Sequence, residues 1–149
     1  MRKLQRLSMY LCFFLGFALV LSGCDKDDEV VQESDLSIEA RNYLNTHFNG
    51  VAVSRVVRDR DDLVDEYEVI LANGVKLEFT EAGAVTSIKS TSQLPDSVIP
   101  AKILTYVKAE YPTFAIVEWE LDSGGQEVQI SNGLELKFNM NGDFLRIDR

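Results

Sequence analysis

The stretch Glu68 to Phe79, EVILANGVKLEF, returns 59 residues later as Glu127 to Phe138, EVQISNGLELKF. Six of the twelve positions are identical, and each copy consists of two alternating apolar and polar runs joined through Asn-Gly. Asn-Gly tolerates the positive φ angles of a tight type I′ turn, so this pattern is a strong signal for a β-hairpin. The chain is therefore expected to be built around two antiparallel hairpins.

A helical pattern precedes each hairpin. Between Leu36 and Phe48 the apolar residues recur at the spacing of one helix face, with Ser37 as a suitable N-cap. The same spacing returns 63 residues later. Pro100 fits only in the first turn of that second helix, which is expected to begin near Ser97.

Two further strand-like segments complete each unit. They are Val51–Asp59 and Ala84–Lys89 in the first unit, and Phe114–Leu121 and Asp143–Asp148 in the second. The predicted fold class is α+β, with two tandem repeats of one helix plus a four-stranded antiparallel sheet, the helices packed on one sheet face. The repeats would span residues 36–90 and 94–149, and their sheets could join side by side or pack face to face.

Residues 1–23 are expected to be a lipoprotein signal peptide. Three basic residues precede a nearly unbroken apolar run of 15 residues, Leu7 to Leu21. A membrane-spanning helix needs roughly 20 residues, so this run is too short. It ends in Leu21-Ser22-Gly23-Cys24, which resembles the bacterial lipobox, where cleavage precedes a cysteine that receives lipid. Cys24 is therefore the expected lipidation site, and the alternative is a free cysteine after a short buried helix.

An acidic segment follows, from residue 24 to residue 35, in which only Val30 and Val31 are apolar. It is expected to be a flexible tether because it can bury little. Its beginning resembles the lysine-plus-acidic tag that sends lipoproteins to the cell surface in some Gram-negative lineages. The alternatives are the periplasmic face of the outer membrane and, because Asp follows the cysteine, the inner membrane. The candidate export signal comprises Asp25, Lys26, Asp27, Asp28 and Glu29.

The charge excludes one class of partner. The chain has 15 Lys and Arg against 24 Asp and Glu, and loss of Arg2, Lys3 and Arg6 with the leader leaves 12 against 24. A body with so many negative charges repels nucleic acids, so nucleic-acid binding is excluded. Cys12 would leave with the leader and Cys24 would carry lipid, so no thiol remains for a disulfide, a metal or a nucleophile.

Catalytic groups are scarce. His47 is the only histidine, and it is expected on a partly exposed flank of its helix. Zinc sites and Cys-His or Ser-His-Asp arrangements therefore lack members. No Gly-rich phosphate loop or nucleophile elbow occurs in the sequence. We predict no catalytic residue and no cofactor, and the chain is not expected to be an enzyme.

The densest run of carboxylates lies just before the first hairpin. Ca²⁺ prefers oxygen ligands, but the spacing of a calcium loop fails at Leu63 and no glutamate stands at its twelfth position. A solvated loop is the main expectation, and weak cation binding is the alternative. The candidate ligands are Asp59, Asp61, Asp62 and Asp65.

The hairpin positions opposite the core form a charged platform if that face is open. Binding surfaces are usually anchored by Trp, Tyr and Arg, and this face offers few of them. A wet, acidic surface for a basic partner is therefore expected, and Trp119 is either a core residue or an exposed anchor. The candidate binding residues are Trp119, Phe114, Glu68, Lys76, Glu78, Glu127, Glu135 and Lys137.

Together these features resemble the PepSY-like, β-lactamase-inhibitor-like family of tandem-repeat bacterial lipoproteins. The first unit departs from the family pattern, with Asn49-Gly50 in place of Tyr-Pro and Ile88-Lys89 in place of the closing Ile-Asp. The second unit has Tyr111-Pro112 at the helix end. Its other matching residues are Glu127, Val128, Asn132, Gly133, Leu136, Phe138, Gly142, Leu145, Ile147 and Asp148.

The resemblance implies a non-enzymatic extracytoplasmic binding or inhibitory module, and it does not make β-lactamase the target. We therefore expect an outer membrane lipoprotein, on the cell surface or the periplasmic face, that binds an unidentified protein or peptide. A protease or hydrolase inhibitor is one form of this function. The alternative is a structural or accessory envelope lipoprotein within a larger assembly.

Overall fold

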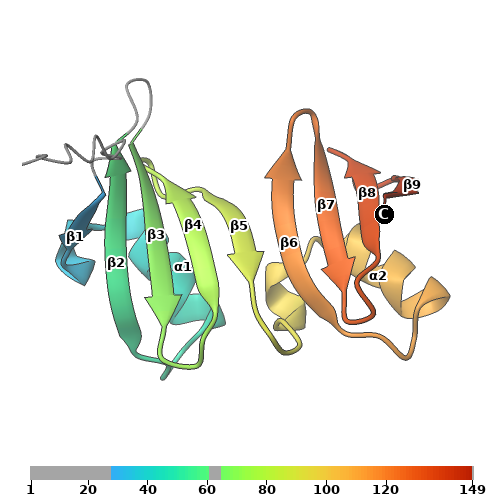
Figure 1. The fold of residues 1–149 in the computed structure, drawn as a ribbon, viewed down its shortest axis with the longest axis horizontal. Helices are drawn as coiled ribbons and strands as arrows, with labels where there is room; N and C mark the ends of the chain where they lie inside the picture. The colour runs from blue at the N-terminus through green and yellow to red at the C-terminus, as the bar shows by residue number, and fades with distance from the viewer. Residues whose placement is uncertain (1–27, 61–64, 149) are drawn as a thin grey trace, which may run out of the picture.

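The computed structural model describes residues 28–60 and 65–148. Within these residues the chain forms one nine-stranded antiparallel sheet, in which β1 to β9 stand in chain order. Two α-helices of ten residues each lie on the same face of that sheet (Figure 1). In the described part of the chain, no helix has both the length and the apolar character needed to span a membrane.

The first half of the sheet is organised by helix α1. Its N-cap is Ser37, as predicted, and the Ser37 Oγ accepts a hydrogen bond of 3.1 Å from the Ala40 N–H. The elements of this half are β1 (Glu29–Val31), a 3₁₀ turn (Glu33–Asp35), α1 (Ile38–His47), β2 (Val53–Arg60), β3 (Asp65–Leu71), β4 (Lys76–Thr80) and β5 (Val85–Lys89).

The second half presents the same succession of one helix and four strands. Pro100 is the N-cap of its helix, because a residue without an N–H is tolerated only at a helix start. The helix therefore begins at residue 101, and the expected start near Ser97 is instead part of a separate 3₁₀ turn. The elements are that turn (Asp96–Val98), α2 (Ala101–Glu110), β6 (Ile116–Asp122), β7 (Gly125–Ile130), β8 (Glu135–Asn139) and β9 (Phe144–Asp148).

The two predicted hairpins are present as β3–β4 and β7–β8. Their loops differ from the expected two-residue turn. Leu71 and Val75 are hydrogen-bonded at 2.8 Å, which leaves three residues between them, and Gly74 closes the loop with φ +84°. A three-residue loop with glycine in the left-handed region is the next most common hairpin connection. Gly133 has the same role in the second hairpin, with φ +85°.

The predicted fold of two repeats, each with its own helix and four-stranded sheet, is wrong, because the nine strands form one sheet in which β5 and β6 are hydrogen-bonded neighbours. Ile88 lies opposite Trp119, and Lys89 lies opposite Glu118. A sheet that ended at β5 would leave unpaired backbone groups and an exposed Ile88, whereas pairing with β6 buries Ile88 completely, to 0 % exposure. The fold is therefore a mostly-sheet α+β fold with one continuous sheet.

The acidic segment before α1 also contributes to the sheet. Glu29 to Val31 pairs with β2, and Glu29 forms an ion pair of 3.1 Å with Arg60. A short strand gains the free backbone groups at the β2 edge as partners, which offsets the weak burial of Val30 and Val31. This part of the predicted tether is thus ordered, and residues 24–27 lie outside the described residues.

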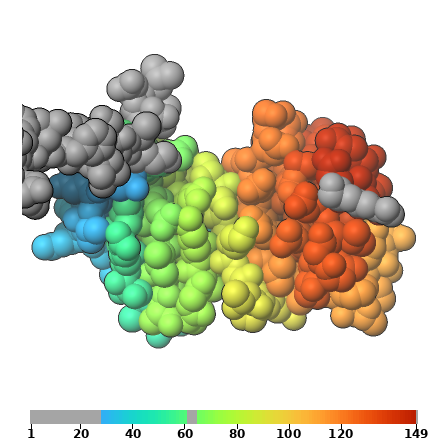
Figure 2. All heavy atoms as spheres, viewed as in Figure 1, coloured from blue at the N-terminus to red at the C-terminus, as the bar shows by residue number. Residues whose placement is uncertain are grey.

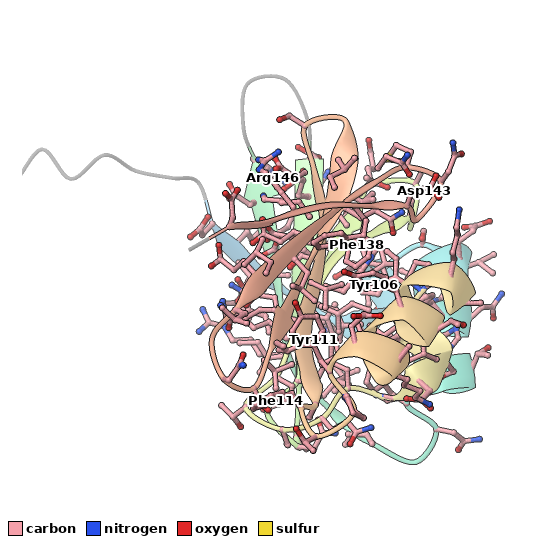
Figure 3. All side chains as sticks on the ribbon, turned by 90° about the vertical axis from the view of Figure 1, so that its right-hand side faces the viewer. Tyr106, Tyr111, Phe114, Phe138, Asp143 and Arg146 are labelled. Carbon is pink, nitrogen blue, oxygen red and sulfur yellow. The ribbon has the colours of Figure 1, made fainter. Side chains whose placement is uncertain are left out.

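The core fills the space between the sheet and the helices. In the first half, Tyr43 of α1 meets Phe79 edge-on, with ring centroids 5.8 Å apart. In the second half, Tyr106 of α2 stacks on Phe144 at 4.7 Å and meets Phe138 edge-on at 5.5 Å (Figure 3). Because both helices pack on the same face, the opposite face of the sheet has no helix from residues 28–60 or 65–148 over it.

Candidate functional site

The face of the sheet that neither helix covers is turned toward the viewer in Figures 1 and 2, and we call it the open face. Side chains alternate between the two faces of a strand, so the paired registers determine which residues lie on it. Among the residues of these paired registers, it carries ten acidic side chains against five basic ones. They are Asp59, Glu66, Glu68, Glu78, Glu118, Glu120, Asp122, Glu127, Glu135 and Asp148, and Arg55, Lys76, Lys89, Lys137 and Arg146.

A cavity of about 320 Å³ opens beside β2, β3 and β4. Val57 and Tyr67 supply its apolar lining, and the rest of its described lining is carboxylate. We call it the acidic cavity. Low-dielectric walls with charges of one sign concentrate the electrostatic potential, so this hollow favours a cationic group. Its carboxylates are Asp28, Asp59, Glu66, Glu68 and Glu78.

Lys76 lies beside the acidic cavity and partly neutralises it. Its Nζ lies 2.5 Å from a Glu68 oxygen and 3.5 Å from a Glu78 oxygen. The hydrogen bond to Glu68 is the main reason that the Lys76 pKa is raised above its usual value. The three predicted binding residues of the first hairpin are therefore in one cluster.

Lys137 has the corresponding position in the second hairpin. It forms ion pairs with Glu127, directly opposite on β7, and with Asp122 at 2.8 Å. The Lys137 and Glu127 side chains are only 15 % and 13 % exposed, so this pair is well shielded from water. Glu135, the other predicted residue of this hairpin, accepts a hydrogen bond of 3.5 Å from Gln129.

The pKa values of two carboxyl groups of β6, Glu120 and Asp122, are shifted in opposite directions. Burial raises the pKa of Glu120, and repulsion from Glu118 adds to the effect. The hydrogen bond from Lys137 lowers the pKa of Asp122. The open face thus has a region near Glu120 where negative charge is costly, and a cation placed there would relieve that cost.

The two predicted aromatic anchors have different positions. Trp119 is a core residue on the helix side of β6, with 6 % exposure, so its role as an exposed anchor is excluded. Phe114 is 40 % exposed and lies before β6, beside a cavity of about 40 Å³ that it shares with Leu94 and Lys108. Phe114 is visible near the lower end of the second half in Figure 3 and does not join the acidic cavity.

Sequence reasoning missed two residues. Gln126 is a buried polar residue of β7 that hydrogen-bonds Trp119, and Tyr67 lines the acidic cavity. The 59-residue shift aligns Gln126 with Tyr67, an inward position of the first hairpin, and this alignment was the available signal. Gln126 supports the core behind the second half of the open face, and Tyr67, a core residue with 7 % exposure, borders the acidic cavity.

The two predicted cation ligands that the structure describes, Asp59 and Asp65, have different surroundings. Asp59 lines the acidic cavity, whereas Asp65 is held by Arg58. Asp61 and Asp62 lie outside the described residues. Within the part that is described, no three His, Cys, Asp or Glu side chains are arranged to hold a metal ion.

The remaining predicted positions are His47 and the candidate lipidation and export residues. His47, at the end of α1, forms a hydrogen bond of 3.0 Å with the Ser97 hydroxyl of the second half. Cys24, Asp25, Lys26 and Asp27 lie outside the described residues. The two other members of the predicted export signal, Asp28 and Glu29, lie at the acidic cavity and in β1.

Solved structures from Bacteroides have this fold. One, from Bacteroides thetaiotaomicron, is described as a "putative calcium-regulated periplasmic protein"; it is 32 % identical over 83 % of this chain and 98 % of its own, with a TM-score of 0.79. A "putative periplasmic protein" of the DUF2874 family from Bacteroides vulgatus is 35 % identical, with a TM-score of 0.78, over 85 % of this chain and 100 % of its own. Another Bacteroides vulgatus protein, described as of unknown function, is 31 % identical, with a TM-score of 0.77, over 82 % and 99 % of the two chains.

A comparison with curated proteins finds no match. The model of one protein family, described as "Putative beta-lactamase-inhibitor-like, PepSY-like", matches residues 65–146. This match confirms the resemblance seen in the hairpins, and the periplasmic relatives support an extracytoplasmic module of the binding type. The chain belongs to the PepSY-like, β-lactamase-inhibitor-like family.

Proposed function

We propose that the protein is a lipid-anchored, non-catalytic module of the outer membrane whose open face binds a basic protein or peptide. The observation that carries this proposal is the excess of ten acidic over five basic side chains in the paired strands, on a sheet face that neither described helix covers. Complementary charge steers a partner toward such a face and orients it there. An inhibitory role, in which the bound partner is a protease or another hydrolase, is one form of this function.

The acidic cavity would be the focus of recognition. A lysine or arginine side chain of the partner could enter between the carboxylates of β3 and β4 while its apolar stem contacts Val57 and Tyr67. Arginine and lysine both combine an apolar stem with a charged end, which suits a cavity with this lining. The ion pairs of Lys76 with Glu68 and Glu78 would be exchanged for pairs with the partner.

Two triple variants test this proposal. The face variant, Glu66→Gln, Glu120→Gln and Glu135→Gln, removes three negative charges from the open face. The helix-side variant, Glu33→Gln, Glu39→Gln and Glu110→Gln, removes three from the opposite side, so both have the same net charge. Proteins captured from an envelope extract at low salt should be retained by the helix-side variant and lost by the face variant. Equal capture by both variants would contradict the proposal.

The anchor is tested separately. Cys24→Ser should release the protein from the membrane fraction, because one lipidated cysteine is the only anchor proposed. Protease added to intact cells would remove a surface-exposed protein and spare one on the periplasmic face. Retention of the Cys24→Ser variant in the membrane would contradict lipid anchoring without touching the binding proposal.

An accessory role within a larger envelope assembly is the competing function. The two functions differ in the stability of the complex, because a binding module should exchange its partner, whereas an assembly subunit should co-purify in a fixed ratio. Elution of the captured partner by about 0.5 M salt is expected for an interface made of screened surface charges. A complex that survives this salt would favour the accessory role.

A calcium response is a second candidate, because one relative is described as calcium-regulated and the acidic cavity offers carboxylate oxygens. The described carboxylates are not preassembled around one point. Binding would have to draw them together, so a weak affinity, on the order of 10⁻⁴ to 10⁻³ M, is expected. Calcium should raise the melting temperature more than magnesium at equal ionic strength, and Glu66→Gln with Glu68→Gln should abolish that difference. Equal effects of the two ions would exclude the response.

A further inference from the structure

β5 and β9 have corresponding positions in the two halves of the sheet. Ile88 lies opposite Leu77, and Ile147, 59 residues later, lies opposite Leu136. Both strands have a register shift at the same point, next to Phe79 in one hairpin and Phe138 in the other. The edge of β5 that faces away from β4 therefore indicates which kind of neighbour the corresponding edge of β9 would accept.

The two isoleucines differ in what covers them. Ile88 is fully buried because β6 pairs with β5 and places Trp119 opposite it. Ile147 is 42 % exposed, since β9 is the last strand of the sheet in the described residues. Figure 3 looks onto this edge, where Arg146 is labelled. An open edge with an exposed apolar side chain is a template for another strand.

The backbone N–H and C=O groups of Ile147 point toward the free edge of β9, where another strand could pair with them. At the β5–β6 join the Ser90 N–H donates to the Val117 carbonyl at 2.9 Å. Backbone groups point to the same neighbour at every second residue, so Ile88 also directs its N–H and C=O toward β6. Ile147 has the register of Ile88 and therefore presents its N–H and C=O at the free edge.

We propose that β9 pairs antiparallel with β9 of a second copy of the chain, about a two-fold axis at Ile147, and so extends the sheet across two molecules. This register places Ile147 opposite its own counterpart and Arg146 opposite the second copy's Asp148, twice by symmetry. A register centred on Arg146 would instead set two arginines against each other. A two-fold contact of this kind is closed and stops at the dimer.

The internal join provides the precedent for these contacts. There an apolar pair, Ile88 with Trp119, stands beside an ion pair of 2.7 Å between Lys89 and Glu118. The dimer would combine the same two kinds of contact. Arg146 and Asp148, which now pair within β9 at 3.1 Å, would each exchange that partner for the second copy's residue.

Engineered cysteines in the full chain test the register. In a hydrogen-bonded antiparallel pair the opposed Cα atoms lie about 5.5 Å apart, within the range a disulfide spans. Ile147→Cys should therefore form disulfide-linked dimers in the oxidising envelope. Leu145→Cys is the matched control, because it is more exposed, at 55 %, yet its Cα would lie about 14 Å from its counterpart. Equal cross-linking of both variants would overturn the proposed register.

Sedimentation of the full chain in detergent tests the contact without a covalent bond. Arg146→Asp or Asp148→Arg alone should weaken dimerisation at least about fivefold, because each replaces two attractive pairs by repulsive ones. The double exchange should restore it. A monomer at every concentration up to about 0.5 mM would overturn the proposal, as would cross-linking of Ile147→Cys to Val30→Cys, since that contact joins β9 to β1 and builds open chains of molecules.

Discussion

The indole Nε1 of Trp119 donates a hydrogen bond of 3.0 Å to the Gln126 side-chain oxygen inside the core. The Gln126 amide nitrogen in turn donates to the backbone carbonyls of Asn139 and Met140, at 3.3 Å each. This one side chain therefore connects β6, β7 and the turn that leads into β9. A buried polar group is tolerated because its hydrogen-bonding groups have partners.

Gln126→Leu should destabilise the fold by about 1–3 kcal/mol, because it leaves the Trp119 N–H and two carbonyls without their partner. Gln129→Leu is the control, since Gln129 lies on the open face and makes one long hydrogen bond of 3.5 Å. Urea unfolding followed by the fluorescence of Trp119, the only tryptophan, measures both. Equal stability of the two variants would show that the buried network contributes little.

Gly83→Ala should be among the most harmful glycine substitutions. Gly83 has φ +87°, and an added Cβ would lie 2.2 Å from the Ser37 Oγ and 2.7 Å from the Ala40 nitrogen, at the start of α1. Gly133→Ala is the control, because its φ is +85° but nothing lies within 4 Å of its added Cβ. Both variants bear the cost of a positive φ, about 1–2 kcal/mol, and only Gly83→Ala should also displace the helix start. Thermal unfolding should therefore rank Gly83→Ala well below Gly133→Ala.

Lys137→Met should cost more stability than Lys102→Met. The first substitution leaves Glu127 shielded from water without its ion-pair partner, whereas the Lys102 pair with Asp143 is more than half exposed on both sides. Exposed pairs contribute about 0–1 kcal/mol, and removal of one member of a shielded pair costs more. Chemical denaturation of the two variants gives the comparison. A larger loss for Lys102→Met would contradict the importance assigned to the Lys137 cluster.

The neighbouring carboxyl groups of β6 should show opposite pH dependence. The raised pKa of Glu120 means that its negative charge costs stability at neutral pH, a cost that disappears as the pH falls through that pKa to below the ordinary value of 4.5. Glu120→Gln should therefore stabilise the protein slightly at pH 7, by less than about 1 kcal/mol because the group is largely hydrated, and not at pH 4.

Asp122 provides the opposite case. Its lowered pKa means that its charge stabilises the fold above the ordinary value of 3.8, and that this stabilisation is lost as the pH falls through the lowered pKa. Asp122→Asn should destabilise the protein at pH 7 and match the parent in strong acid. Melting temperatures measured from pH 7 down to about pH 2 test both variants. Shifts of the same sign at pH 7 would contradict this account of the open face.

The alternation of apolar and polar residues was enough to predict both hairpins and to place Glu68, Lys76 and Glu78 together on the sheet face opposite the core. It could not predict how the two halves meet, because the β5–β6 join depends on free backbone groups rather than on side-chain periodicity. The strand β1 was missed for the same reason, since three residues in an acidic segment carry no periodic signal. The sequence also could not show on which face of its strand Trp119 lies, because this depends on its partners Ile88 and Gln126.

The most direct test of the central claim, that the open face is the binding surface, is the affinity of the captured partner for the two triple variants. We expect the helix-side variant to bind within about twofold of the parent chain, since its charges lie behind the sheet. The face variant should bind at least about tenfold more weakly, because it loses three charges at the interface. Equal loss of affinity in both variants would show that only net charge matters, and unchanged affinity of the face variant would place the partner elsewhere.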